Sequence, residues 1–141
     1  MHTYDSLTVG DTFSAERTFT QEDVQQFAAL TGDDNPIHVD PAYAETTRFG
    51  HTIVHGVFLL GIVSKVLGKD FPGHGSVAVN ISCRFLRPVP VGDTITVEVK
   101  VSEKIEKHRH VRIRIFVYNK GKMVLGGDAT VIPPSPEEEA S

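Results

Sequence analysis

The chain has only one cysteine, Cys83, in 141 residues, so no disulfide can form within it. A lone thiol suits a reducing compartment. No apolar run reaches the length of a membrane span. Residues 1–5 lack the basic and apolar regions of a secretion signal. We therefore expect a cytoplasmic protein with no membrane segment.

An excess of basic residues is also lacking. The 14 Lys and Arg residues are outnumbered by 18 Asp and Glu, and the net charge of −4 gives no positive footprint for nucleic acid. Hydrophobic residues make up 40% and charged residues 23%, which is typical of a soluble globular protein. We expect one domain over 1–132 and a disordered acidic tail over 133–141.

The second half of the chain has the pattern of an antiparallel sheet. Apolar and polar residues alternate over 77–85, 94–101 and 111–117, which predicts half-buried strands. The turn signal at 119–122 predicts a hairpin that leads into a strand over 123–132. Cys83 falls on the apolar face of its strand, which indicates a small core residue.

Helices are expected in the first half, after a strand over 12–19. Thr20 and Asp23 resemble a capping box. The helix that they start should bury Val24, Phe27, Ala28 and Leu30 on one face.

A second, short helix should run from Pro41 to Thr46, with Asp40 as its N-cap. The segment from Ile53 to Gly68 is apolar nearly all round, which predicts a helix buried on most sides that stops at Gly68. These elements predict an α+β fold in which one central helix is wrapped by a curled antiparallel sheet.

The segment 30–38 holds the densest group of reactive side chains. Gly32 and the Asn35-Pro36 pair favour a sharply bent loop. Asp33 and His38 lie five positions apart, so they cannot share one helical face, but the bend could bring them to one point. A carboxylate and an imidazole that share a water form an acid/base pair. The alternative is that these residues only make a turn.

Gly32-Asp33-x-Asn35-Pro36-Ile37-His38, followed by Ile53-Val54-His55-Gly56, closely resembles the R-specific enoyl-CoA hydratases of the MaoC-like family. The resemblance extends from about residue 7 to 132. It implies the hot-dog fold and the reversible syn addition of water to trans-2-enoyl-CoA, which gives (R)-3-hydroxyacyl-CoA.

The resemblance also implies the site residues. Asp33 and His38 would hold the catalytic water, and our working hypothesis makes Asp33 the base and His38 the proton donor to C2. The amide of Gly56 would form the oxyanion hole, although this glycine could merely relieve packing. Asn35 and Ser64 would support the site.

Other polar residues have two interpretations each. His55 could be a buried structural histidine or a substrate contact, and its spacing from His51 would suit a metal pair, but the glutamate of the zinc-protease pattern is absent. We expect no metal and no cofactor. Position 34, which varies in the family motif, is a second carboxylate here. Candidates for binding CoA phosphates, or for ordinary surface charge, are Arg84, Arg87 and Lys104.

The function expected first is thus an (R)-specific enoyl-CoA hydratase acting on an acyl-CoA thioester. The alternatives are a 3-hydroxyacyl dehydratase acting on acyl carrier protein and a non-catalytic acyl-CoA-binding subunit. The presence of both Asp33 and His38 argues for catalysis. A homodimer is expected, because hot-dog folds pair through their sheets.

Overall fold

The computed structural model describes residues 1–137. Its elements in chain order are β1 (Thr12–Thr18), α1 (Gln21–Thr31), α2 (Pro36–Val39), α3 (Pro41–Glu45), α4 (Gly56–Lys65), the π-helical turn η1 (Val66–Asp70), β2 (Val77–Phe85), β3 (Thr94–Ile105), β4 (His110–Asn119) and β5 (Lys122–Ile132).

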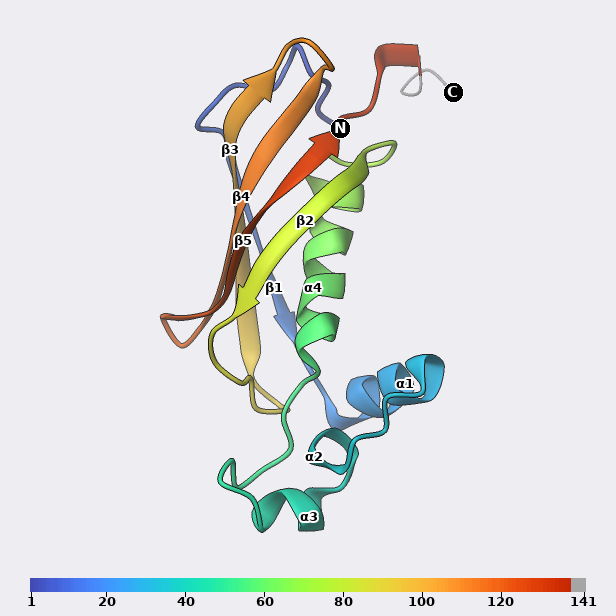
Figure 1. The fold of residues 1–141 in the computed structure, drawn as a ribbon, viewed down its shortest axis with the longest axis vertical. Helices are drawn as coiled ribbons and strands as arrows, with labels where there is room; N and C mark the ends of the chain where they lie inside the picture. Colours follow the sequence, from blue (N-terminus) through green and yellow to red (C-terminus); the bar gives the residue numbers. More distant parts are fainter. Residues whose placement is uncertain (138–141) are drawn as a thin grey trace.

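The five strands form one antiparallel sheet in the order β1-β3-β4-β5-β2. The sheet curls along one side of α4, and α1, α2 and α3 gather at the end where α4 begins (Figure 1). This is the hot-dog architecture expected from the sequence, so the predicted α+β fold is confirmed. No helix within residues 1–137 is long and apolar enough to cross a membrane.

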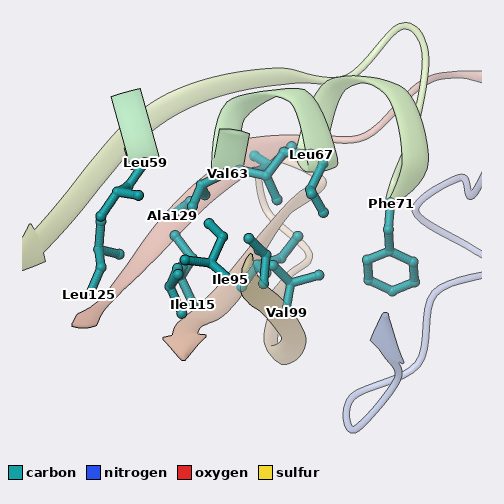
Figure 2. Packing of buried hydrophobic residues seen from close by; sticks show 14 of the residues in the cluster. Leu59, Val63, Leu67, Phe71, Ile95, Val99, Ile115, Leu125 and Ala129 are labelled. Carbon is teal, nitrogen blue, oxygen red and sulfur yellow. The ribbon is translucent and has the colours of Figure 1, made fainter. Parts of the chain in front are cut away.

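The core lies between α4 and the middle of the sheet. The alternation predicted for the third and fourth strands is confirmed, because every apolar residue of that pattern is fully buried: Ile95, Val97, Val99, Val101, Val111, Ile113, Ile115 and Val117. Leu59, Val63 and Leu67 meet them from the helix side (Figure 2). Burying one such side chain stabilises a fold by about 1.5–3 kcal/mol, so this layer holds α4 against the sheet.

The expectation that the apolar face of β2 is half-buried is wrong for much of the strand. Val77 is 55% exposed and Phe85 is 52% exposed. The reason is that β2 is an edge strand, while the buried strand residues of the core come from β3, β4 and β5. Cys83 is half-buried, and burial raises the pKa of its thiol.

The central helix also differs from its prediction. It is not buried on most sides, because Val57, Gly61 and Ser64 are exposed along one face. Gly68 does not stop it either, since the helical turns of η1 continue to Asp70. Gly68 is not among the glycines at positive φ, so it makes no left-handed break, and the chain leaves the helix at Phe71.

The start of α1 is confirmed in detail. Thr20 Oγ1 accepts a hydrogen bond from the Asp23 N–H, and Asp23 Oδ2 accepts one from the Thr20 N–H, both at 3.0 Å. Leu30 is not on the buried face as expected: it is 88% exposed, because it lies beyond the part of α1 that contacts the core. Gly32, at φ 82°, ends the helix in the left-handed region.

Two local predictions in loops are also confirmed. Asp40 caps α3 through its side chain, with Pro41 at the first helical position. Lys120 and Gly121, both at positive φ, turn the hairpin between β4 and β5. After β5, Pro133 and Pro134 are buried. Residues 138–141 of the expected acidic tail lie outside the described residues.

Candidate active site

The loop after α1 fixes the carboxylate of Asp33. The N–H of Asn35 donates to Asp33 Oδ1 at 3.4 Å, and Asn35 Oδ1 in turn accepts from the Ile37 N–H at 3.4 Å. Asn35 therefore links the carboxylate to the first turn of α2. His38 lies within this short helix and not in the open loop expected from the sequence, because Pro36 suits the first position of a helix.

The imidazole of His38 has a defined tautomer. Its Nδ1 lies 2.7 Å from the carbonyl oxygen of Ile53. A carbonyl oxygen only accepts, so Nδ1 carries the proton and Nε2 keeps its lone pair in the neutral ring. Burial lowers the pKa of His38, and the nearby His55 acts in the same direction, against opposing effects of the Ile53 carbonyl and Asp33. The neutral ring is thereby favoured.

His55 lies behind this pair and is 1% exposed. Its ring stacks on that of His38 with centroids 3.9 Å apart, and it meets the ring of Phe27 at a tilt of 50° with centroids 4.6 Å apart. His55 Nε2 donates to the backbone carbonyl of Asp33 at 2.9 Å. His55 thus holds the backbone of one candidate catalytic residue and the ring of the other.

Asp33, His38 and His55 each place one nitrogen or carboxylate oxygen within 4.8 Å of the others. The two imidazole planes are only 25° apart, so their lone pairs cannot converge on one ion at about 2.0–2.1 Å. His55 Nδ1 is buried and has no partner among the described residues. The cluster suits proton transfer better than metal binding.

The beginning of α4 supplies free N–H groups. His55 is the N-cap residue and makes no side-chain cap. Within residues 1–137, the N–H groups of Gly56 and Val57 donate to no protein acceptor. The end of a helix concentrates partial positive charge at such groups. Position 56 also faces Phe85, since a Cβ there would lie 2.9 Å from Cδ1 of the ring.

These groups border one cavity of about 540 Å³. Its polar and charged lining comes from Asp33, His38, His55, Arg48 and Arg87. The apolar lining includes Phe49, Ile53, Val54, Val57, Leu59, Phe85, Leu86 and Val89. Asp34 lines a different hollow, beside Gly32 and Gln25, so the geometry favours Asp33 as the carboxylate of the site.

Several residues proposed from the sequence lie elsewhere. Ser64 is exposed on α4, eight positions beyond Gly56, which is about 12 Å along the axis at ~1.5 Å per residue, and it makes no hydrogen bond to Asp33. Arg84 borders a hollow on another part of the sheet with Arg114. Lys104 lies over the ring of Tyr4. His51 is not part of the Asp33–His38–His55 cluster.

Some residues in the cavity lining or in the second layer behind it were not predicted from the sequence. Gln21 and Gln25 hold the carbonyls of His38 and Val39 through their Nε2 atoms, at 3.0 and 2.9 Å. Arg48 lines the cavity next to Arg87. Glutamines at the start of a surface helix give no signal by themselves, because only the tertiary fold shows that their helix packs on α2.

The curled antiparallel sheet around one helix defines a hot-dog protein. A carboxylate and an imidazole lie at the end where that helix begins and form a candidate acid/base site. The sequence matches the family described as MaoC like domain over residues 7–119. This chain belongs to that family, as its motifs predicted.

The relatives of the chain include proteins named as hydratases and dehydratases. An (R)-specific enoyl-CoA hydratase from Rhodospirillum rubrum is 38% identical over 135 residues, which is 96% of this chain and 94% of that protein. A 3-hydroxybutyryl-CoA dehydratase from Methylorubrum extorquens is also 38% identical, over 96% of this chain and 86% of that one. The solved structure of the (R)-hydratase from A. caviae involved in PHA biosynthesis aligns with a TM-score of 0.89 and 38% identity, covering 92% of this chain and 98% of that one. The hydro-lyase activity expected from the sequence is the activity named for these relatives.

Proposed function

We propose that the protein is an (R)-specific enoyl-CoA hydratase that adds water reversibly and syn across trans-2-enoyl-CoA. The observation that carries this proposal is the placement of Asp33 and His38. A carboxylate oxygen and a ring nitrogen lie within 4.8 Å of each other in a cavity that also borders the unpaired N–H of Gly56. One water with hydrogen bonds of about 2.7–2.8 Å to both groups fits this spacing.

His38 is the group that deprotonates the water. Its Nδ1 proton is held by the Ile53 carbonyl, so Nε2 can only accept while the ring is neutral. As the water oxygen bonds to C3, its proton moves to Nε2, and the resulting imidazolium then gives that proton to C2. Delivery from one ring accounts for addition to a single face. This assignment keeps His38 as the proton donor to C2, as in our working hypothesis, but makes it the base as well, in place of Asp33.

Asp33 orients the water and stabilises the imidazolium. Its carboxylate is held through Oδ1 by the N–H of Asn35, and its backbone is held by His55. The Gly56 N–H donates a hydrogen bond to the thioester oxygen while negative charge develops on that oxygen. Such preorganised donors are worth about 10²–10³ in rate in other enzymes.

The CoA portion of the substrate is held by arginines. Arg48 and Arg87 line the cavity and are exposed, which leaves their guanidinium groups accessible to phosphate oxygens. Arg87 is oriented by its hydrogen bond to the Met123 carbonyl. Arg84, which the sequence also suggested, does not line this cavity but borders another hollow, which shares Leu86 with it.

The protein acts as a homodimer. The edge strand β2 exposes Val77 and Phe85, and α4 exposes Val57 beside it, so both elements offer apolar surface that a second copy would cover. An exposed apolar edge strand that has no pairing partner is otherwise prone to aggregation. The acyl-CoA substrate and the single cysteine favour a cytoplasmic location.

The test is the loss of enoyl-thioester absorbance when crotonyl-CoA is added to the wild-type protein. A stereospecific dehydrogenase coupled to the product then reports the (R) configuration. Turnover with the enoyl group on acyl carrier protein but not on CoA would instead support the carrier-protein dehydratase. No turnover of CoA or carrier-protein substrates of any chain length would reject the hypothesis of an enzyme in favour of an acyl-CoA-binding subunit.

A further inference from the structure

Gln21, the first residue of α1, bridges two segments that meet at His38. Its Nε2 donates to the backbone carbonyl of His38 at 3.0 Å. Its Oε1 accepts from Thr52 Oγ1 at 2.8 Å. Gln21 is partly buried, and Thr52 is 7% exposed. One side chain therefore fixes the spacing between α2 and the segment that precedes α4.

That spacing determines the geometry of the imidazole. Thr52 directly precedes Ile53, whose carbonyl accepts from His38 Nδ1 at 2.7 Å. The Ile53 N–H also donates to the carbonyl of Ile37, at 3.2 Å. The ring of His38 and its own backbone are thus tied to the same short segment, and Gln21 closes the connection from the other side.

We propose that Gln21, acting with Thr52, is a positioning residue that keeps the Nδ1–H of His38 on the Ile53 carbonyl and so leaves Nε2 as the proton acceptor. The inference rests on the proposed function for its effect on catalysis. It does not depend on that function for the tautomer itself.

The physical reason is that the direction of the Nε2 lone pair follows from the hydrogen bond at Nδ1. If α2 moves away from Ile53, this bond lengthens and the other tautomer becomes accessible, in which Nε2 carries the proton and cannot accept. Displacing a reacting group by about 1 Å can cost about 10²-fold in rate. Neither Gln21 nor Thr52 lines the cavity, so neither is required to touch substrate.

Few charged or titratable groups face His38, and uncharged replacements at positions 21 and 52 would leave all of them in the protein. Asp33 faces it from the loop after α1, and His55 faces it from the N-cap of α4. The guanidinium groups of Arg48 and Arg87 line the same cavity. Uncharged replacements at 21 and 52 therefore change the position of the ring without adding or removing charge.

The variants are Gln21→Met and Thr52→Val, which keep side-chain size while removing the two hydrogen bonds. Thr52→Ser keeps the hydroxyl and serves as the conservative rescue. Gln25→Met is the matched control, because Gln25 lies one turn further along α1 and bonds the carbonyl of Val39, with no tie to Thr52. All four are measured as the full-length protein, with folding checked by circular dichroism.

We expect Gln21→Met and Thr52→Val each to lower kcat with crotonyl-CoA by about 10- to 100-fold, with KM changed less than about three-fold. The double variant should lose no more than the worse single variant, since both bonds act as one unit. Thr52→Ser and Gln25→Met should stay within about two-fold of wild type. Unchanged kcat in both Gln21→Met and Thr52→Val would overturn the proposal, and so would an equal loss in Gln25→Met.

A second readout does not require turnover. The ¹⁵N shifts of the His38 ring, assigned by comparison with His38→Gln, should show Nδ1 protonated and Nε2 unprotonated in the neutral wild type. Gln21→Met should move these two shifts toward each other, while Gln25→Met leaves them in place. If the variants change the shifts in this way but the wild-type protein has no hydratase activity, the proposed function is rejected and the positioning role is kept. Identical shifts in wild type and Gln21→Met would reject the positioning role alone.

Discussion

The effect of Gly56→Ala on stability should depend on the residue at position 85. The substitution should destabilise the protein when Phe85 is present and should not do so when position 85 is alanine. An added Cβ would lie 2.9 Å from Cδ1 and 3.0 Å from Cε1 of Phe85, which is closer than such atoms pack. Overpacking of this kind costs about 1–3 kcal/mol. Alanine favours a helix over glycine by at most about 1 kcal/mol. Phe85 is half-exposed and can partly yield, so we expect a net loss of about 1 kcal/mol in the free energy of unfolding.

In the Phe85→Ala background the clash is gone while the helix preference remains. Gly56→Ala should then be neutral or stabilising by a few tenths of a kcal/mol. Urea denaturation of the wild type, both single variants and the double variant gives the coupling directly. Equal changes from Gly56→Ala in both backgrounds would refute the reasoning from the Phe85 contact.

Hydration rates in the same four proteins separate the two explanations for the glycine. The N–H of residue 56 survives the substitution, so activity should return together with stability in the double variant, to the level of Phe85→Ala alone. A double variant that is stable but slow would show that the substrate itself needs glycine at this position.

Three further results are expected. Burial lowers the pKa of His38 below its ordinary 6.5. The contribution of His38 to the free energy of unfolding is therefore full above pH 6.5 and is lost as the pH falls from 6.5 through the folded pKa. The urea midpoint should drop more steeply over this interval in wild type than in His38→Gln. Val77→Lys should turn the proposed homodimer into a monomer in light scattering, whereas Val9→Lys, at the same 55% exposure, should not. Burial raises the pKa of the Cys83 thiol, so its reaction with a disulfide reagent at pH 8 should be slow in the folded protein and fast in urea.

Local chemistry explains which parts of the fold could be predicted from the sequence. The capping box at Thr20 and the turn at Lys120-Gly121 depend on residues a few positions apart, and both were predicted correctly. The exposed side of β2 could not be predicted, because alternation shows that a strand has an apolar face but not whether that strand ends at the edge of the sheet. The prediction that Leu30 is buried was wrong for a similar reason. Periodicity shows which face of a helix is apolar, but how far along the helix that face contacts the core depends on the elements packed against it.

The candidate site shows the same division. The bend between Asp33 and His38 follows from Gly32 and the Asn35-Pro36 pair. The sequence could not show which nitrogen of His38 carries the proton, because the acceptor is a backbone carbonyl from Ile53. Gln21 gave no signal for the same reason, since its partners are contributed by distant segments.

The central claim is that Asp33 and His38 together activate water. The most direct test is the crotonyl-CoA hydration rate of Asp33→Asn and His38→Gln beside two matched controls, Asp34→Asn and His108→Gln. Asp34 lines another hollow and His108 is exposed outside the cavity. We expect kcat to fall by about 10²–10⁴ in the first pair and to stay within two-fold in the controls, with all four proteins folded. A loss in Asp34→Asn as large as in Asp33→Asn, or full activity in His38→Gln, would contradict the account.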